Sequence, residues 1–305
     1  MTFDAPLPAR AQRRVAIPFI VCTMVWGSTW FVIGSQLHYA PGAWSVVYRF
    51  ALASIAMFIT ATWMRVRITL PAHAHPLALI FGITQFTLNY TFVYAAEDRI
   101  ASGLVALVSA LLIVPNALLA RLFLGQSVSR RFLLGSGIAI AGIALLFAHE
   151  MGQSANNSHR IFTGVAFSLI GLSAASIANV LQATRRAAAL PPPTLLAWGM
   201  VYGTAFDAAW AWISVGPPVF SFAPAYIAGL FYLALMGSAV TFSLYFALIR
   251  QIGPARAGYI AVLVPVIAML LSTLFEGYHW TATAAAGALL TIAGLVVAMR
   301  ARSAR

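Results

Sequence analysis

Long apolar stretches alternate with short polar connectors along almost the whole chain. Most of the stretches are about 20 residues long, which is the length of helix needed to cross a hydrocarbon core about 30 Å thick. They lack the period-two alternation of a transmembrane barrel, so the pattern predicts helices. We expect ten spans, at residues 15–35, 44–64, 75–96, 100–122, 132–147, 161–184, 194–214, 226–249, 257–275 and 281–299. The fifth stretch is short and the connector before it is poorly defined, so nine spans is the competing count.

Composition favours a polytopic, all-α membrane protein over a soluble domain. Hydrophobic residues make up 62% of the chain and charged residues 8%, which is too little charge to cover the surface of a soluble protein of this length. A signal peptide is the alternative for the first stretch. No small-residue cleavage site follows that stretch, however, and it is long enough to span.

The arginines predict the orientation of the spans. With the N-terminus inside, they gather at the cytoplasmic ends of the predicted spans, and only Arg99 and Arg160 fall at the opposite ends. This is the positive-inside pattern, and it predicts that both termini are cytoplasmic (N-in/C-in). The cytoplasmic set is Arg10, Arg13, Arg14, Arg65, Arg67, Arg121, Arg130, Arg131, Arg185, Arg186, Arg250, Arg256, Arg300, Arg302 and Arg305. Membrane topology thus accounts for the net charge of +12, and no nucleic-acid partner is expected.

One sizeable polar connector, residues 149–160, lies near the centre of the chain and separates residues 1–148 from residues 161–305. Each side holds five predicted spans. Because five is odd, two related halves would cross the membrane in opposite directions, as in the inverted repeats of secondary transporters. The sequence therefore predicts two inverted five-helix repeats.

The halves resemble each other most in their fourth and fifth spans. Pro115 in the fourth span matches Pro265 in the ninth, and a polar residue ends each span at the same distance from its proline, Gln126 in one and Glu276 in the other. Proline removes a helix hydrogen bond and favours a kink, so Pro115 and Pro265 are candidate hinge or gate residues. The alternative is that they only shape packing.

Small residues recur at the same spacing in the last span of each half. Gly135 and Gly142 are seven residues apart in the fifth span, and Gly287 and Gly294 are seven apart in the tenth. Each pair falls on one helical face, where small residues let two helices approach closely.

Three features together resemble the EamA branch of the drug/metabolite transporter superfamily: the run from Trp26 to Thr29 in the first span, the proline-to-acid segments followed by glycine-bearing spans, and residues 253–257 before the ninth span. The length and the ten spans resemble bacterial YddG-type amino-acid exporters. The resemblance implies that each half is one EamA-like repeat and that the protein moves small molecules across the membrane. The chain departs from the family pattern in having Gln126 where a glutamate is usual, and in lacking a tryptophan in the sixth span.

Polar and aromatic side chains within the spans are candidates for binding the substrate. They are placed at helical spacing and should face inward, although hydrogen bonding between helices is an equal explanation for several of them. Arg49 is a candidate for recognising a carboxylate, against snorkelling to the outer interface, and it could instead pair with Asp207 of the seventh span. The candidates are Trp26, Ser28, Arg49, Gln85, Asn89, Asn179, Trp198, Tyr202 and Tyr245.

Other chemistry finds little support in the sequence. The single cysteine, Cys22, lies in a span, no metal-ligating set is visible, and we expect no cofactor and no enzymatic activity. The carboxylates Glu97, Asp98, Glu150 and Glu276 map to outer edges and are expected to be solvated.

The expected function is export of small metabolites across a bacterial inner membrane by alternating access, with aromatic or neutral amino acids as the leading substrates. The partners are then the substrate and the lipid bilayer, and a monomer is compatible with the sequence. The alternatives are a multidrug or lipophilic-cation exporter of the same superfamily and, ranked lowest, a membrane-embedded protein that does not transport. Small multidrug members of the superfamily keep an acidic residue in the first span, where it binds protons and cations. The first span of this chain has no such residue, which argues against export of lipophilic cations by the same means.

Overall fold

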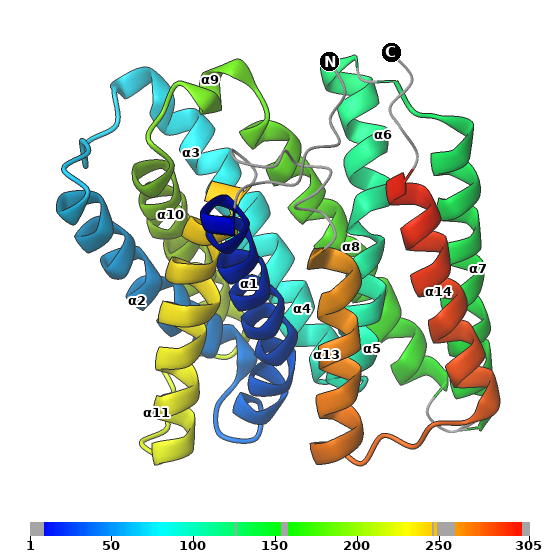
Figure 1. Cartoon of the computed structure of the whole chain (residues 1–305). Coiled ribbons are helices and arrows are strands. Elements are labelled where there is room, and N and C mark those ends of the chain that lie inside the picture. Colours follow the sequence, from blue (N-terminus) through cyan, green and yellow to red (C-terminus); the bar gives the residue numbers. More distant parts are fainter. Residues whose placement is uncertain (1–8, 126, 154–157, 246, 249–259, 301–305) are drawn as a thin grey trace.

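The computed structural model describes residues 9–125, 127–153, 158–245, 247–248 and 260–300, and these residues form helices and no strand (Figure 1). Gln126 and residues 253–257, which contribute to the family resemblance, lie outside this part of the chain. The elements are α1 (Ala9–Gln36), α2 (Gly42–Trp63), η1 (Ala72–Ala74), α3 (His75–Gly82), η2 (Ile83–Leu88), α4 (Asn89–Glu97), α5 (Ser102–Ser109), η3 (Ala110–Leu112), α6 (Ile113–Leu124), α7 (Arg130–Gln153), α8 (Ser158–Gln182), α9 (Arg185–Ala188), α10 (Pro192–Ser214), α11 (Pro224–Phe231), η5 (Tyr232–Val240), α13 (Ile260–Phe275) and α14 (Ala282–Arg300).

Among the described residues, seven helical stretches are long and apolar enough to cross a membrane. They coincide with predicted spans one to six and eight. The other predicted spans are occupied by α10, which has 23 residues, and by the shorter apolar helices α13 and α14. The prediction of an all-helical, multi-pass protein is therefore confirmed.

Helix α7 corrects two details of the sequence interpretation. It is 24 residues long, against the short fifth span expected at 132–147, and it runs on to Gln153, while α8 already begins at Ser158. Most of the expected polar connector at 149–160 is therefore helical. Polar side chains near a helix end remain solvated there without interrupting the backbone hydrogen bonds, so polarity alone placed the helix end too early. The long α7 removes one of the two reasons for a nine-span count, the short fifth stretch.

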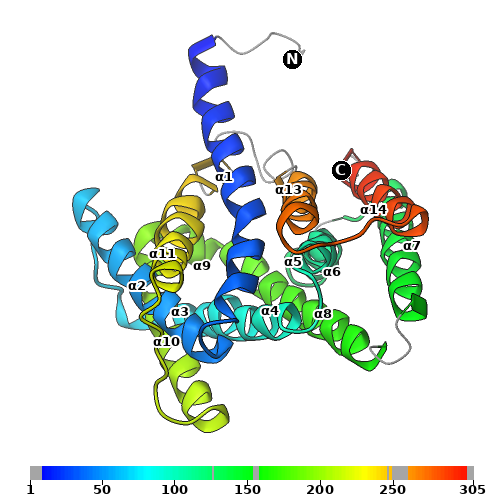
Figure 2. The same ribbon diagram turned by 90° about the horizontal axis from the view of Figure 1, so that it is seen from below.

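Helices α7 and α14 pack antiparallel along one edge of the molecule, where both views show them side by side (Figures 1 and 2). Gly135 faces Gly294 and Gly142 faces Gly287. A Cβ on Gly142 would lie 2.6 Å from the carbonyl oxygen of Gly287, and a Cβ on Gly135 would lie 2.6 Å from that of Gly294. Larger side chains do not fit there, so the predicted close approach through paired glycines is confirmed.

The opposite edge is formed by α2 packed against α10, and α1 lies between η5 and α13 (Figure 2). The two largest apolar clusters among the described residues lie in the interior. One is built around Phe50, Phe81 and Phe86 between α2, α3, η2 and α10, and the other around Leu107 and Leu146 between α5, α7 and α14. The polar side chains described below lie among and between these clusters.

Two π-helical segments interrupt the α-helical spans, and the sequence did not predict them. Segment η2 lies in the third predicted span and η5 in the eighth, so each half has one in its third span. A π segment widens the turn and changes which carbonyls its side chains reach, and such segments are frequent at functional sites. In η5, the Ser238 hydroxyl donates to the carbonyl of Leu233, five residues earlier.

The two candidate hinge prolines differ in their surroundings. Pro265 lies inside the continuous helix α13. Pro115 follows the 3₁₀ turn η3, so the helical geometry changes just before it. Their role in movement stays a prediction.

Candidate functional site

Trp26 joins α1 to the π segment of the eighth span. Its indole N–H donates to the carbonyl oxygen of Gly237 across 3.2 Å. The indole also makes edge contacts with the rings of Tyr245 and Phe242, with centroids 5.0 Å and 5.5 Å away. Because this ring is fixed by both a hydrogen bond and aromatic packing, it holds one orientation beside η5.

The residues after Trp26 hold α1 against two other helices. A Cβ on Gly27 would lie 2.5 Å from the Cβ of Ile267 on α13, so only glycine allows this approach. The hydroxyls of Ser28 and Tyr232 are 2.6 Å apart, which links α1 to η5 a second time. This run therefore packs α1 closely against both η5 and α13.

Arg49, on α2, is buried with a relative exposure of 1% and does not snorkel to the interface. Its Nε donates to the Ser238 hydroxyl at 3.3 Å. The guanidinium carbon lies 4.5 Å from the ring centre of Tyr90 and 5.3 Å from that of Phe50. Aromatic faces attract a cation but supply no counter-charge, so the positive charge has no acidic partner among the described residues.

Several polar groups around this arginine have hydrogen-bonding capacity to spare. Nη1 of Arg49 and Oε1 of Gln36 are buried without a partner, and the hydroxyl of Tyr94 lies beside the guanidinium. The Tyr226 hydroxyl, also near Tyr94, lies 2.9 Å from that of Ser45. Since buried polar groups are nearly always paired in a stable protein, these unpaired atoms point to a ligand or water that completes the network.

Arg49 and Asp207 do not pair with each other. Asp207 is fully buried on α10, and both of its carboxylate oxygens lack a hydrogen-bond partner. It lies beside Thr87 of η2, whose hydroxyl donates to the carbonyl of Gly203 at 3.0 Å. In the part of the chain that the structure describes, the ion pair is Arg99 with Asp98, so the idea that Arg49 and Asp207 neutralise each other is wrong.

Trp198 and Tyr202 lie elsewhere, at the connector between α2 and α3. The Trp198 indole donates to the carbonyl of Ile68 at 2.8 Å, and the Tyr202 hydroxyl is 2.7 Å from Nδ1 of His75. The two side chains lie on one face of α10, and this face meets the connector and not Arg49.

The three amide candidates are also dispersed. Gln85 is buried in the π segment η2. Asn89 packs against Gly171 of α8. A Cβ added to Gly171 would lie 3.0 Å from the carbonyl oxygen of Asn89. Asn179 donates to the side chain of Asn116, next to Pro115, at 3.4 Å.

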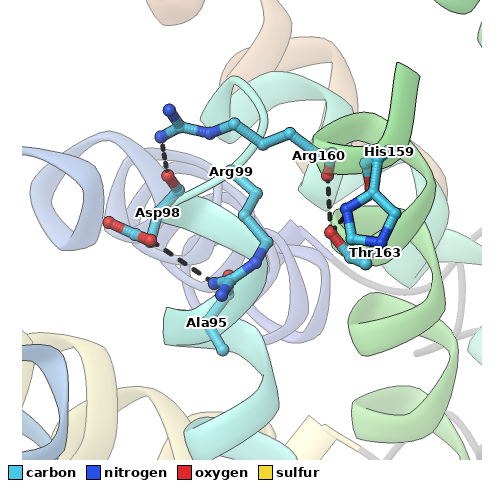
Figure 3. Close-up of polar contacts among 6 residues, drawn as sticks. All are labelled: Ala95, Asp98, Arg99, His159, Arg160 and Thr163. Atoms are coloured by element: carbon cyan, nitrogen blue, oxygen red, sulfur yellow. Dashed lines mark hydrogen bonds and ion pairs between the residues drawn. The ribbon is translucent and has the colours of Figure 1, made fainter. Parts of the chain in front are cut away.

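The connector from α4 to α5 carries a polar cluster at the end of the molecule opposite Ala9 (Figures 1 and 3). Arg99 pairs with Asp98, and Arg160 donates to the Asp98 backbone carbonyl, which ties this connector to α8. Asp98 is exposed, as expected. Glu97 is not, because its relative exposure is 8% and it accepts a hydrogen bond from Ser102 at 2.5 Å. The expectation that Glu97 is solvated is wrong, since its side chain turns inward from the last turn of α4.

The candidates thus separate into one group around η5, formed by Trp26, Ser28, Arg49 and Tyr245, and others that do not join it. Sequence reasoning missed Tyr90 and Tyr94, which face Arg49. Their spacing of four on one helix, in a span that also carries Gln85 and Asn89, was the available signal.

Comparison with known proteins agrees with this architecture. A solved crystal structure superposes with a TM-score of 0.67 at 16% identity, covering 94% of this chain and 97% of that one, which shows the fold. The chain is 23% identical to the protein PagO of Salmonella typhimurium strain LT2, over 87% of this chain and 86% of that protein.

Two further relatives carry descriptive names. An inner membrane transporter of Escherichia coli K12, YedA, is 28% identical over 83% of this chain and 80% of its own length. A probable amino-acid metabolite efflux pump of Salmonella typhimurium strain LT2 is 23% identical over 94% of this chain and 95% of its own length.

The EamA-like transporter family matches this chain twice, over residues 14–148 and 162–300. The apolar helices and the named relatives make it a multi-pass protein of the bacterial inner membrane. The protein belongs to the EamA-like transporter family, within the drug/metabolite transporter superfamily.

Proposed function

We propose that this protein exports small metabolites that carry a carboxylate, with aromatic or neutral amino acids as the leading case. It does so by alternating access between two inverted five-helix halves, with both termini in the cytoplasm. The observation that carries the proposal is the buried Arg49, whose charge has no acidic partner among the described residues.

The inverted repeat is supported by how the helices pack. When one half is mapped onto the other, α1 corresponds to α8, α13 to α6 and η5 to η2. The contacts of α1 with α13 and with η5 then correspond to the contacts of α8 with α6 and with η2. All four contacts are present. The third span of each half has a π segment, and the family matches each half once. An inverted repeat gives two equivalent arrangements of the halves, which is what alternating access requires.

The orientation rests on charge placement. The start of α1, the short helix α9 and the end of α14 lie at one end of the molecule (Figure 1). Exposed arginines at this end include Arg65 and Arg67 after α2 and Arg185 and Arg186 in α9, whereas Arg160 is exposed at the other end. In a Cys22→Ser background, His279→Cys at the other end should react with an impermeant thiol reagent applied to intact cells, and Thr69→Cys should not. The opposite labelling would reverse the orientation.

Arg49 is suited to bind a carboxylate. An uncompensated charge in the membrane interior costs several kcal/mol, and this cost is repaid when an anion binds, because the guanidinium fork matches a carboxylate. The rings of Tyr90 and Phe50 face the guanidinium, and Trp26 and Tyr245 lie at the same segment, η5, so aromatic surroundings that suit an apolar side chain are close by. A lipophilic cation would instead be repelled by Arg49.

The test is transport into liposomes by the purified protein, with labelled phenylalanine and other amino acids, and with lipophilic cations as the competing class. Phenylalaninamide, which lacks the carboxylate, is the matched control. We expect flux of at least one amino acid, competition by its carboxylate analogues and no competition by the amide. Proton-driven movement of the cations with no flux of any amino acid would contradict the proposal.

A further inference from the structure

Two glutamates that are far apart in the sequence meet at the end of α1 opposite Ala9. Glu97 ends α4, and Glu276 directly follows α13. If Gly34 carried a Cβ, it would lie 3.2 Å from Oε2 of Glu97 and 3.3 Å from Oε1 of Glu276. The absence of a side chain on α1 at this position therefore leaves room for the two carboxyl groups.

Ser102, the first residue of α5, connects the two carboxyl groups. Its hydroxyl is 2.5 Å from Oε2 of Glu97, and its backbone N–H donates to Oε2 of Glu276 at 3.2 Å. The Ser272 hydroxyl donates to the same Glu276 oxygen at 2.5 Å. The cluster thus joins α1, α4 and α5 of the first half to α13 of the second.

The two carboxyl groups have different surroundings. Glu276 is exposed and accepts hydrogen bonds from two donors, one of them the N-terminal amide of α5. Glu97 is buried, and its Oε1 has no hydrogen-bond partner. A buried carboxylate with an unpaired oxygen next to another carboxylate is costly, so Glu97 is the member of the pair that holds a proton.

No positive side chain offsets Glu97 among the described residues. The titratable group that faces it from another helix is Glu276, and α1 presents only Gly34 at this point. Asp98 and Arg99, which follow it in the chain, pair with each other at the surface, with relative side-chain exposures of 60% and 32%. A bound proton is thus the available compensation for the Glu97 charge.

We propose that Glu97, next to Glu276, binds and releases a proton during transport. This rests on the proposed function, because it assigns the proton a place in the movement of the two halves. In the release step, the Glu97 O–H bond breaks, its proton passes to water, and Glu97 is left as a carboxylate. Two facing carboxylates then repel each other, which loosens the contact between the halves at this end.

Infrared spectroscopy of the purified protein in lipid tests the site without any substrate. The carbonyl stretch of protonated carboxyl groups is followed as the pH is raised, in an Asp207→Asn background that removes the other carboxyl group that is buried among the described residues. We expect a signal at neutral pH that disappears at higher pH and is absent in Glu97→Gln. In Glu276→Gln the signal should disappear at a pH lower by about one unit, because the neighbouring charge is gone. The matched control, Asp98→Asn, should leave the signal unchanged.

Three results would overturn the proton site: no such signal, a signal that survives in Glu97→Gln, or no shift in Glu276→Gln. Replacing choline with sodium should leave the titration unchanged, and displacement of the proton signal by sodium would make this a general cation site. If Glu97→Gln does not fold, the difference in titration pH between the parent protein and Glu276→Gln still tests whether the proton site is present.

A transport measurement separates this inference from the proposed function. In liposomes, Glu97→Gln should retain exchange of substrate between equal concentrations but lose its response to a pH gradient. Retention of the full response would count against the role of Glu97 in transport. If the unmodified protein moves no amino acid while the infrared titration is as expected, the proposed function fails and the proton site stands.

Discussion

Arg49 donates from Nε to the hydroxyl of Ser238 across 3.3 Å, and this contact joins the first half of the chain to the π segment of the second. Ser238 in turn donates to the carbonyl of Leu233. The widened turn of η5 therefore sets the position of the hydroxyl that orients the guanidinium. Nη1 stays unpaired, so the arginine is held in place while keeping a donor for a ligand.

Replacing Arg49 by methionine should make the protein more stable. Methionine is unbranched and apolar, and its burial avoids the cost of several kcal/mol of keeping an ion out of water. We expect a melting temperature several degrees above that of the unmodified protein, measured in detergent without substrate. A lower melting temperature would mean that the charge is already compensated and that Arg49 is a structural residue.

The glycine contact between α7 and α14 should not tolerate a larger side chain. Gly142→Val forces a branched side chain against the backbone of Gly287, at a cost of about 1–3 kcal/mol or more, and should lower the melting temperature by several degrees. Gly137 lies on the same helix, and a Cβ added there would meet no described atom from a neighbouring helix within 4 Å. Gly137→Val is therefore the matched control. Equal effects of both changes would show that helix propensity matters here and packing does not.

Pro115→Ala and Pro265→Ala should slow transport more than they weaken substrate binding, because each restores a helix hydrogen bond at a predicted hinge. Binding is measured by calorimetry and transport by exchange in liposomes. Pro18, also inside a helix but near its start, is the control, and Pro18→Ala should change neither. Parallel losses of binding and transport in the first two variants would argue against a hinge.

Trp26 should influence which substrates are accepted. Trp26→Phe keeps an aromatic ring but removes the N–H that donates to Gly237, whereas Trp26→Ala also removes the edge contacts with Tyr245. We expect Trp26→Phe to lower transport of all substrates alike and Trp26→Ala to change their order in a competition assay. An unchanged order in Trp26→Ala would limit Trp26 to packing.

The sequence predicted those parts of the fold that depend on local patterns. Apolar length identified the helices, and the spacing of Gly135 and Gly142 identified a close contact, because both follow from the geometry of a single helix. The π segments could not be predicted in this way, since their formation depends on packing between helices. The early end assigned to α7 came from treating polar residues as a boundary.

The candidate site was predicted less well than the fold. Arg49 and Trp26 do approach the same segment, η5. Trp198, however, belongs to a different cluster. The position of a residue on a helical face predicts that its side chain points inward, but it does not predict which neighbouring side chain it contacts. Glu97 was missed for a related reason. It precedes the charged pair Asp98 and Arg99, and sequence does not reveal that adjacent carboxylates point in opposite directions.

The most direct test of Arg49 as the carboxylate site is exchange of labelled amino acid in liposomes that contain equal amounts of the unmodified protein, Arg49→Met or Arg49→Lys. We predict exchange by the unmodified protein, at least a tenfold loss in Arg49→Lys and none detectable in Arg49→Met, because loss of a charge-assisted pair costs about 2–5 kcal/mol. Correct folding of Arg49→Met is established by its melting temperature. Exchange by folded Arg49→Met at the rate of the unmodified protein would contradict a role for Arg49 in binding the substrate carboxylate.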